Sequence, residues 1–119
     1  MEAKYYHKEL SNGKWQEFSF AEQMANIGSE VERAIKWKNK NKPERSQSAF
    51  FRALELMDFT ISDKCNINRL DELCRTREVL VDYFFSDNQY KSSDALWQKY
   101  FRAFNWYANL LRNKQSNIQ

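Results

Sequence analysis

Residues 19–38, SFAEQMANIGSEVERAIKWK, decide the fold class because a helix start is followed by a helical apolar row. Ser19 and Glu22 form a capping-box pattern, in which the two side chains accept free backbone N–H groups at the first turn. Gly28 would let a neighbouring helix approach closely. Apolar side chains recur every three or four residues, at Phe20, Met24, Ile27, Val31 and Ile35. This spacing predicts an amphipathic α-helix.

The composition of the whole chain favours the same class. Its 119 residues include two Gly and one Pro, while 29% of them are charged and 16% are aromatic. Turn-rich β architectures and disordered linkers need the opposite balance, and this length suits one domain with one core. We therefore expect a single all-α domain, an antiparallel up-and-down four-helix bundle that spans residues 19–112.

Two further helices follow from apolar rows of the same spacing. The second helix is predicted from Pro43, which suits a first turn because it has no N–H to leave unpaired, to about residue 63. Its inward row is Phe50, Ala53, Leu54, Met57 and Ile61. The third helix is predicted from an N-cap at Asn68 to about Phe85. Its inward row is Leu70, Leu73, Cys74, Leu80, Val81 and Phe84.

The fourth helix is predicted to begin after a cap at Ser92 or Ser93 and to end near residue 112. Its inner face carries Trp97, Tyr100, Phe101, Phe104, Ala108 and Leu111. Residues 113–119 are expected to fray, as chain ends commonly do. The short links between the four helices favour antiparallel neighbours.

Residues 1–18 precede the bundle and admit two interpretations. Asn12 and Gly13 form the preferred pair for a two-residue turn, which predicts a small hairpin. The alternative is an irregular arm that lays Tyr6, Leu10 and Trp15 on the bundle, because an isolated two-stranded hairpin is marginally stable in water.

Charge, hydropathy and cysteine content disfavour several classes of protein. Lys and Arg exceed Asp and Glu by 19 to 16, which is a small excess beside that of domains that coat nucleic acid. No apolar stretch is long enough to cross a bilayer, and residues 1–10 do not resemble a signal peptide. We therefore expect a cytoplasmic protein without a membrane partner. Cys65 and Cys74 lack the spacing of a metal site, and we expect no metal and no cofactor.

Arg77 falls within the apolar row of the third helix, four residues after Leu73 and four before Val81. A buried guanidinium needs a carboxylate, because an unpaired buried charge is strongly destabilising. Glu30 and Asp58 are the candidate partners. We interpret Arg77 as part of an internal salt-bridge network, or as a side chain that extends to the end of the bundle, in preference to a ligand-binding or catalytic residue.

A polar row along the first helix is a candidate binding surface. It consists of Gln23, Asn26, Glu30, Arg33 and Trp37, at spacings of three and four residues. Such a row is able to bind a polar ligand or a partner helix, but it more often supplies hydrogen bonds between helices. Both interpretations stay open.

The segment after the first helix is the best nucleic-acid signal in the chain. Its cations are Lys36, Lys38, Lys40, Lys42 and Arg45. Lysines can follow a phosphate backbone while Trp37, which lies among them, stacks on a base. A solvated loop carries lysines too. RNA or DNA binding is therefore an alternative function.

The carboxylates give little support to catalysis. Glu55 with Asp58 and Glu78 with Asp82 are helical pairs that would hold Mg²⁺ if they faced each other, as in all-α nucleotide pyrophosphatases. The dense ExxE pattern of those enzymes is absent, and solvated helices often carry such pairs. His7 is the only histidine, so a helical acid–base or di-iron site is not indicated. We predict no catalytic residue, and metal-dependent nucleotide hydrolysis is a further alternative.

Phe59, Val79 and Trp106 are predicted to project opposite the inner rows of their helices. Single exposed apolar residues are normal, but three on one small bundle favour a covering arm or pairing of subunits. The leading hypothesis is a non-enzymatic binding or accessory protein that contacts a protein partner or a second copy of itself.

Several blocks of the chain resemble a family of small bacterial and archaeal proteins with no assigned activity. The blocks are Trp15, residues 22–31 (EQMANIGSEV), Arg33-Ala34-Ile35, Trp37, residues 52–56 (RALEL), residues 77–80 (REVL), Asp82-Tyr83-Phe84, Tyr100-Phe101 and Phe104. The resemblance covers residues 15–111. It implies a compact helical protein and supplies no catalytic residue.

Overall fold

The computed structural model describes residues 13–118, with side chains described through residue 114. These residues form four α-helices, which are α1 (Phe20–Asn39), α2 (Pro43–Ser62), α3 (Leu70–Phe85) and α4 (Asp94–Ile118). Two 3-10 helices, η2 (Lys14–Glu17) and η3 (Lys64–Arg69), precede α1 and α3. No strand occurs in residues 13–118. The predicted all-α class with four helices is confirmed.

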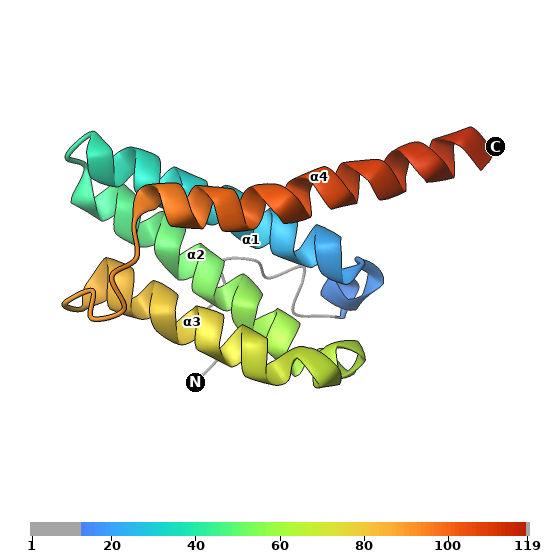
Figure 1. The fold of residues 1–119 in the computed structure, drawn as a ribbon, viewed down its shortest axis with the longest axis horizontal. Helices are drawn as coiled ribbons and strands as arrows, with labels where there is room; N and C mark the ends of the chain where they lie inside the picture. Colours follow the sequence, from blue (N-terminus) through green and yellow to red (C-terminus); the bar gives the residue numbers. More distant parts are fainter. Residues whose placement is uncertain (1–12, 119) are drawn as a thin grey trace.

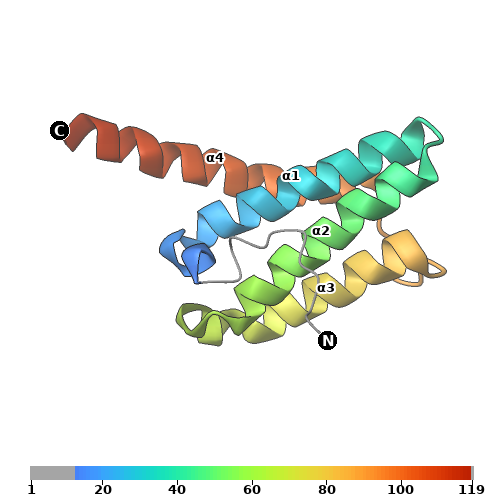
Figure 2. The same cartoon turned by 180° about the vertical axis from the view of Figure 1, so that it is seen from behind.

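Successive helices run in alternating directions, as Figure 1 shows. α1 packs along α2 and also contacts α4, while α3 packs on the other side of α2. α4 crosses α1 and then continues beyond it, so its C-terminal end projects from the bundle in both Figure 1 and Figure 2. No helix in the described part of the chain is long and apolar enough to cross a bilayer.

The predicted start signals of α1 and α4 are confirmed by hydrogen bonds. Ser19 Oγ accepts the N–H of Glu22 at 3.1 Å, and the Glu22 carboxylate accepts the N–H of Ser19 at 3.1 Å. Ser93 Oγ accepts the N–H of Leu96 at 3.2 Å, next to the first turn of α4. Pro43 is the first residue of α2. These side chains satisfy donors that the helices cannot pair internally.

The predicted N-cap of α3 is wrong, because Asn68 lies inside η3 and α3 begins at Leu70. Asp63 starts η3 instead, and its Oδ1 accepts the N–H of Cys65 at 3.0 Å. An aspartate side chain that bonds to the backbone two residues later offers the chain an alternative to the α-helix. The 3-10 turns of η3 follow, and the α-helix begins after them.

Most of the predicted apolar rows lie in the core. Its largest fully buried apolar side chains are Trp15, Phe50, Met24, Ile27, Ile35, Met57, Leu73, Leu80 and Val31. Cys74 is exposed, so its assignment to the core is wrong. The buried row of α3 is Leu73, Thr76 and Leu80. Cys74 lies roughly 100° around the helix from Leu73, which places it outside that row.

Gly28 allows α1 and α4 to approach closely. A Cβ atom at this position would lie 2.7 Å from the Cβ of Phe101, far inside van der Waals contact. Because that atom is next to the backbone of α4, the helices would have to separate to admit any larger residue. The role predicted for Gly28 is confirmed.

The two ends of the described chain depart from the predicted pattern. Residues 1–12, which include Tyr6 and Leu10, lie outside the described residues, so the first arm of the predicted hairpin is not tested. Residues 14–17 form η2 and not a strand, and Trp15 within it is 1% exposed. α4 continues through Ile118 where fraying was predicted from residue 113. No Gly or Pro interrupts residues 113–118, so the backbone there is free to stay helical.

Candidate functional site

Arg77 lies at the surface, so the prediction of a buried guanidinium is wrong. Its Nε donates to Asp58 Oδ1 at 2.8 Å, and the two side chains are 36% and 57% exposed. Asp58 is the partner that was predicted, but Glu30 takes no part in this pair. An exposed pair of this kind contributes little to stability, and it encloses no space in which a ligand is held.

The polar row of α1 divides into separate environments. Gln23 and Glu30 are buried, while Asn26 and Arg33 are exposed. Asn26 Nδ2 donates to the backbone of its own helix, at Glu22 O, over 2.8 Å. The row is therefore not one continuous binding surface.

The Gln23 side chain is the centre of a network that joins η2, α1, α2 and η3. Its Nε2 donates to Trp15 O and to Asp63 Oδ2, both at 3.0 Å, and its Oε1 accepts from Asn66 Nδ2 at 2.9 Å. Asn66 also donates to Thr60 O at 3.0 Å, and Trp15 Nε1 donates to Thr60 Oγ1 at 2.9 Å. A buried network in which these groups are satisfied within the protein fixes one arrangement of the core. Gln23 therefore has a structural role.

Glu30 is shared by two arginines. Arg33 Nη1 lies 2.9 Å from Glu30 Oε1, and Arg52 Nε of α2 lies 3.0 Å from Glu30 Oε2. A buried carboxylate needs such partners. Glu30 thus links α1 to α2, and the two guanidinium groups leave this edge of α1 positively charged.

Trp37 is surrounded by cations of the predicted nucleic-acid segment. The charged groups of Lys36, Lys40 and Arg45 lie 5.8, 5.5 and 4.7 Å from the centroid of its ring. These distances suit cation–π attraction. Lys42 is exposed in the turn that follows α1.

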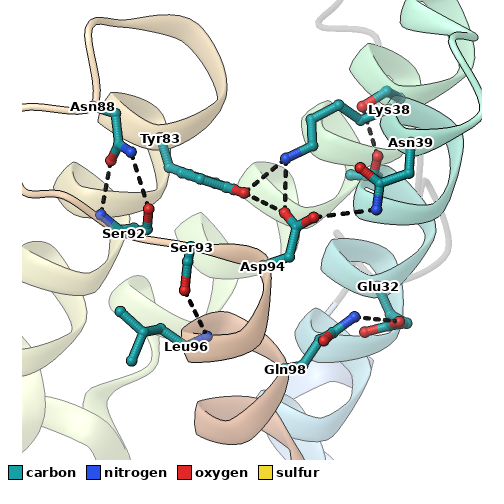
Figure 3. Close-up of polar contacts among 12 residues, drawn as sticks. Glu32, Lys38, Asn39, Tyr83, Asn88, Ser92, Ser93, Asp94, Leu96 and Gln98 are labelled. Atoms are coloured by element: carbon teal, nitrogen blue, oxygen red, sulfur yellow. Dashed lines mark hydrogen bonds and ion pairs between the residues drawn. The ribbon is translucent and has the colours of Figure 1, made fainter.

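Lys38 is directed into the junction of α1, α3 and α4, as Figure 3 shows. Its Nζ lies 2.7 Å from Tyr83 Oη and 2.7 Å from Asp94 Oδ1. The Tyr83 hydroxyl also donates to Asp94 Oδ1, and Asn39 Nδ2 donates to Asp94 Oδ2 at 3.1 Å. The Lys38 ammonium group is therefore bound by side chains of α3 and α4 in a partly buried cluster. Sequence reasoning missed Tyr83 and Asp94, because Asp94 gave only the signal of a helix start.

The pKa shifts of Lys38, Tyr83 and Asp94 fit a structural role, in which these side chains hold α1, α3 and α4 together. Partial burial alone would lower the pKa of Lys38, but hydrogen bonds to Asp94 and Tyr83 outweigh it and raise this pKa. Partial burial alone would raise the pKa of Asp94, but hydrogen bonds from Lys38, Tyr83 and Asn39 hold it below its usual value. Burial, followed by the bond to Asp94, raises the pKa of Tyr83. A general acid or base needs a pKa near the working pH, and these shifts move each group away from it.

We expect the stabilising effect of Asp94 to depend on pH. Because its pKa is lowered in the folded state, its contribution is present above the usual carboxyl pKa of 3.8 and is lost as the pH falls through the lower folded pKa. The pKa values of Lys38 and Tyr83 are raised, so their contribution is present below the usual pKa values of 10.5 and 10.0 and is lost at higher pH. Thermal unfolding of the wild type and Asp94→Asn should therefore differ most near neutral pH and converge at both extremes. A difference that does not change with pH would contradict this assignment.

Carboxylates of the predicted pairs accept hydrogen bonds from other groups of the protein. Glu78 Oε1 accepts from the Tyr90 hydroxyl at 3.0 Å, and the Asp82 carboxylate accepts the N–H groups of Gln89 and Tyr90 at 2.9 and 3.1 Å. In the described part of the chain, no three His, Cys, Asp or Glu side chains gather in a way that would hold a metal ion. The hydrolase alternative therefore gains no support from these residues.

Of the three residues predicted to face outward, Trp106 is 64% exposed. Phe59 and Val79 are partly buried and pack against the core, so the prediction is wrong for these two. Tyr107 and Leu110 add exposed apolar area beside Trp106, with exposed fractions of 52% and 37%. The three exposed residues lie in the middle of α4, next to the segment where Ala108 and Leu111 pack against Ala21 and Ala25 of α1.

A shallow groove of about 310 Å³ borders this part of α4. It lies between α4, the start of α1 and the end of η3, and Ala103 and Tyr107 contribute to its α4 wall. Phe20 and Arg69 line the opposite wall, where the Arg69 guanidinium lies 4.2 Å from the centroid of the Phe20 ring. We call Ala103, Trp106, Tyr107 and Leu110 the α4 flank.

Comparison of the chain with protein-family models, with curated proteins and with solved structures found no match. The resemblance to a family of small bacterial and archaeal proteins therefore stays a prediction. The function has to be argued from the geometry of the described residues.

Proposed function

We propose that this protein is a non-enzymatic interaction module whose α4 flank binds an amphipathic helix of an acidic partner protein. The observation that carries the proposal is Trp106, a large aromatic side chain 64% exposed on a helix that extends past the bundle. Trp and Tyr are enriched among the residues that dominate binding energy at protein interfaces.

The spacing of the α4 flank suits contact with another helix. Its four residues lie at positions i, i+3, i+4 and i+7, which share one side of a helix and form the pattern of helix-in-groove recognition. The adjoining groove beside Phe20 and Arg69 offers a place for an apolar side chain of the partner.

The charge of α4 selects the kind of partner. After Asp94 the helix contains no acidic residue, and its cations are Lys99, Arg102, Arg112 and Lys114. Complementary charge steers association and excludes partners of the same sign. A partner helix with acidic flanks therefore fits better than a second copy, which in a symmetric pairing would bring cations of one α4 against cations of the other.

Nucleic-acid binding through the segment after α1 is the second candidate. The cluster of Lys36, Lys40 and Arg45 around Trp37 favours it. The Arg45 guanidinium, however, lies over the ring of Trp37, where a base would have to stack. Lys38 is also held by Asp94 and Tyr83. Among the described residues, no cation–π contact or ion pair is found for the α4 flank, and we prefer it for that reason.

The experiment starts from affinity capture with the wild type and with a Trp106→Ala, Leu110→Ala double variant. The acidic helix of a partner retained only by the wild type is then made as a peptide and titrated by calorimetry. We expect the double variant to weaken binding by at least about 100-fold, because two central apolar contacts are lost. Added salt should weaken the binding of the wild type.

Phe51→Ala is the matched control, since Phe51 is a 39% exposed aromatic residue on α2, away from the α4 flank. This control should bind the peptide as the wild type does. Equal binding by the double variant would contradict the proposal. A dimer of the wild type that dissociates in the double variant would replace the partner with a second copy. RNA binding that is lost when Lys36, Lys40 and Lys42 are changed to Gln would favour the second candidate.

A further inference from the structure

A second groove, of about 580 Å³, runs between α1 and α4. Gln98, Arg102 and Asn105 line its α4 side, and none of them belongs to the α4 flank. The close crossing at Gly28 brings polar side chains of both helices to this groove. Its volume lies within the range of sites that hold small molecules.

The groove is positively charged. Arg33, Lys36 and Arg102 line it, against the single carboxylate of Glu32. Glu32 is engaged by Gln98, whose Nε2 donates to Glu32 Oε1 at 3.1 Å across the two helices, as Figure 3 shows. No ion pair is found for Lys36 or Arg102 in the described part of the chain. These two cations are available to an anion.

Trp97 contributes to the lining of this groove and is 7% exposed. Its indole Nε1–H has no acceptor among the described residues, but this atom is itself enclosed by protein. Trp97 is held in place by the Tyr100 and Phe101 rings, whose centroids lie 5.9 and 6.1 Å away. Its indole N–H signal therefore reports on what binds beside it.

We propose that the groove between α1 and α4 binds a small phosphorylated molecule. Arg102 and Lys36, which line the groove, neutralise the phosphate. Charge-assisted hydrogen bonds to phosphate are among the strongest polar contacts that a protein makes. Ser29 and Asn105 offer hydrogen bonds to the remainder of the molecule.

The experiment uses inorganic phosphate as the probe and follows the indole N–H signals in ¹H–¹⁵N NMR spectra at constant ionic strength. The chain has four Trp residues, and Trp97→Phe identifies the Trp97 signal by its disappearance. We expect this signal to shift saturably as phosphate is added. Arg102→Gln should raise the dissociation constant about tenfold or more, the effect expected from losing one charge-assisted hydrogen bond.

Arg112→Gln is the matched control, because it removes the same charge from the same helix outside the groove. Its dissociation constant should equal that of the wild type. A Trp97 signal that stays fixed, or an equal effect of the two arginine variants, would overturn the proposal. The Trp106→Ala, Leu110→Ala variant should still bind phosphate, so this result and the partner experiment are decided separately.

Discussion

Trp15→Ala is expected to lower the free energy of unfolding by about 3–5 kcal/mol, the range typical of removing a buried aromatic side chain. Trp15 is 1% exposed and packs edge-on against Phe18, with ring centroids 5.6 Å apart. Its indole N–H also donates to Thr60 Oγ1 at 2.9 Å. The substitution therefore leaves a cavity and removes a buried hydrogen bond between η2 and α2.

Urea unfolding followed by far-ultraviolet circular dichroism measures this change, because the transition midpoint reports stability when the slope is unchanged. Trp106→Ala is the matched control, since the same side chain is 64% exposed there. The control should change stability by no more than about 0.5 kcal/mol. Equal midpoints for the Trp15 variant and the wild type would show that η2 does not stabilise the bundle.

Gln23→Leu is expected to destabilise the fold by about 2–5 kcal/mol. The volume of the side chain is nearly kept, but the Trp15 carbonyl and the Asp63 carboxylate each lose a donor from the amide. Each buried polar group left unsatisfied costs about 1–3 kcal/mol, and more when it is charged. Asn66 loses its bond to Gln23 and keeps its bond to Thr60 O.

Asn26→Leu is the matched control, because Asn26 is an exposed amide of the same helix that bonds only to Glu22 O. Its stability should stay within about 0.5 kcal/mol of the wild type. The same urea transitions give both values. If Gln23→Leu were as stable as the control, the network around Gln23 would not be needed to hold η2 and η3 against α1.

The first helix shows how much of the structure can be predicted from local sequence pattern. Its start at Ser19, its buried row and the close approach at Gly28 all follow from residues within a few positions of one another. The burial or exposure of each residue in the polar row of the same helix could not be predicted in this way. Burial of Gln23 and exposure of Asn26 depend on where α2, η2 and η3 lie, and the helix itself does not contain that information.

The candidate sites show the same limit. Lys36 and Lys38 are close in sequence and looked equivalent, yet Lys38 is bound to Asp94, 56 residues away in the chain. Lys36 lines the groove between α1 and α4. Arg102 and Trp97 gave no sequence signal as a site, because a single cation and a core Trp on one helix are ordinary. Only the crossing of α1 and α4 places these two residues beside Lys36.

The sequence by itself determined the helical class, the number of helices and most of their starts. These properties depend on hydrogen bonds and side-chain spacing within one or two turns. Only the tertiary structure decided that Arg77 pairs with Asp58, that Gln23 is buried, that Lys38 is bound to Asp94, and that Trp106 stays uncovered on α4. The reason is physical, because the burial and partner of a polar side chain depend on how helices are turned and crossed against one another.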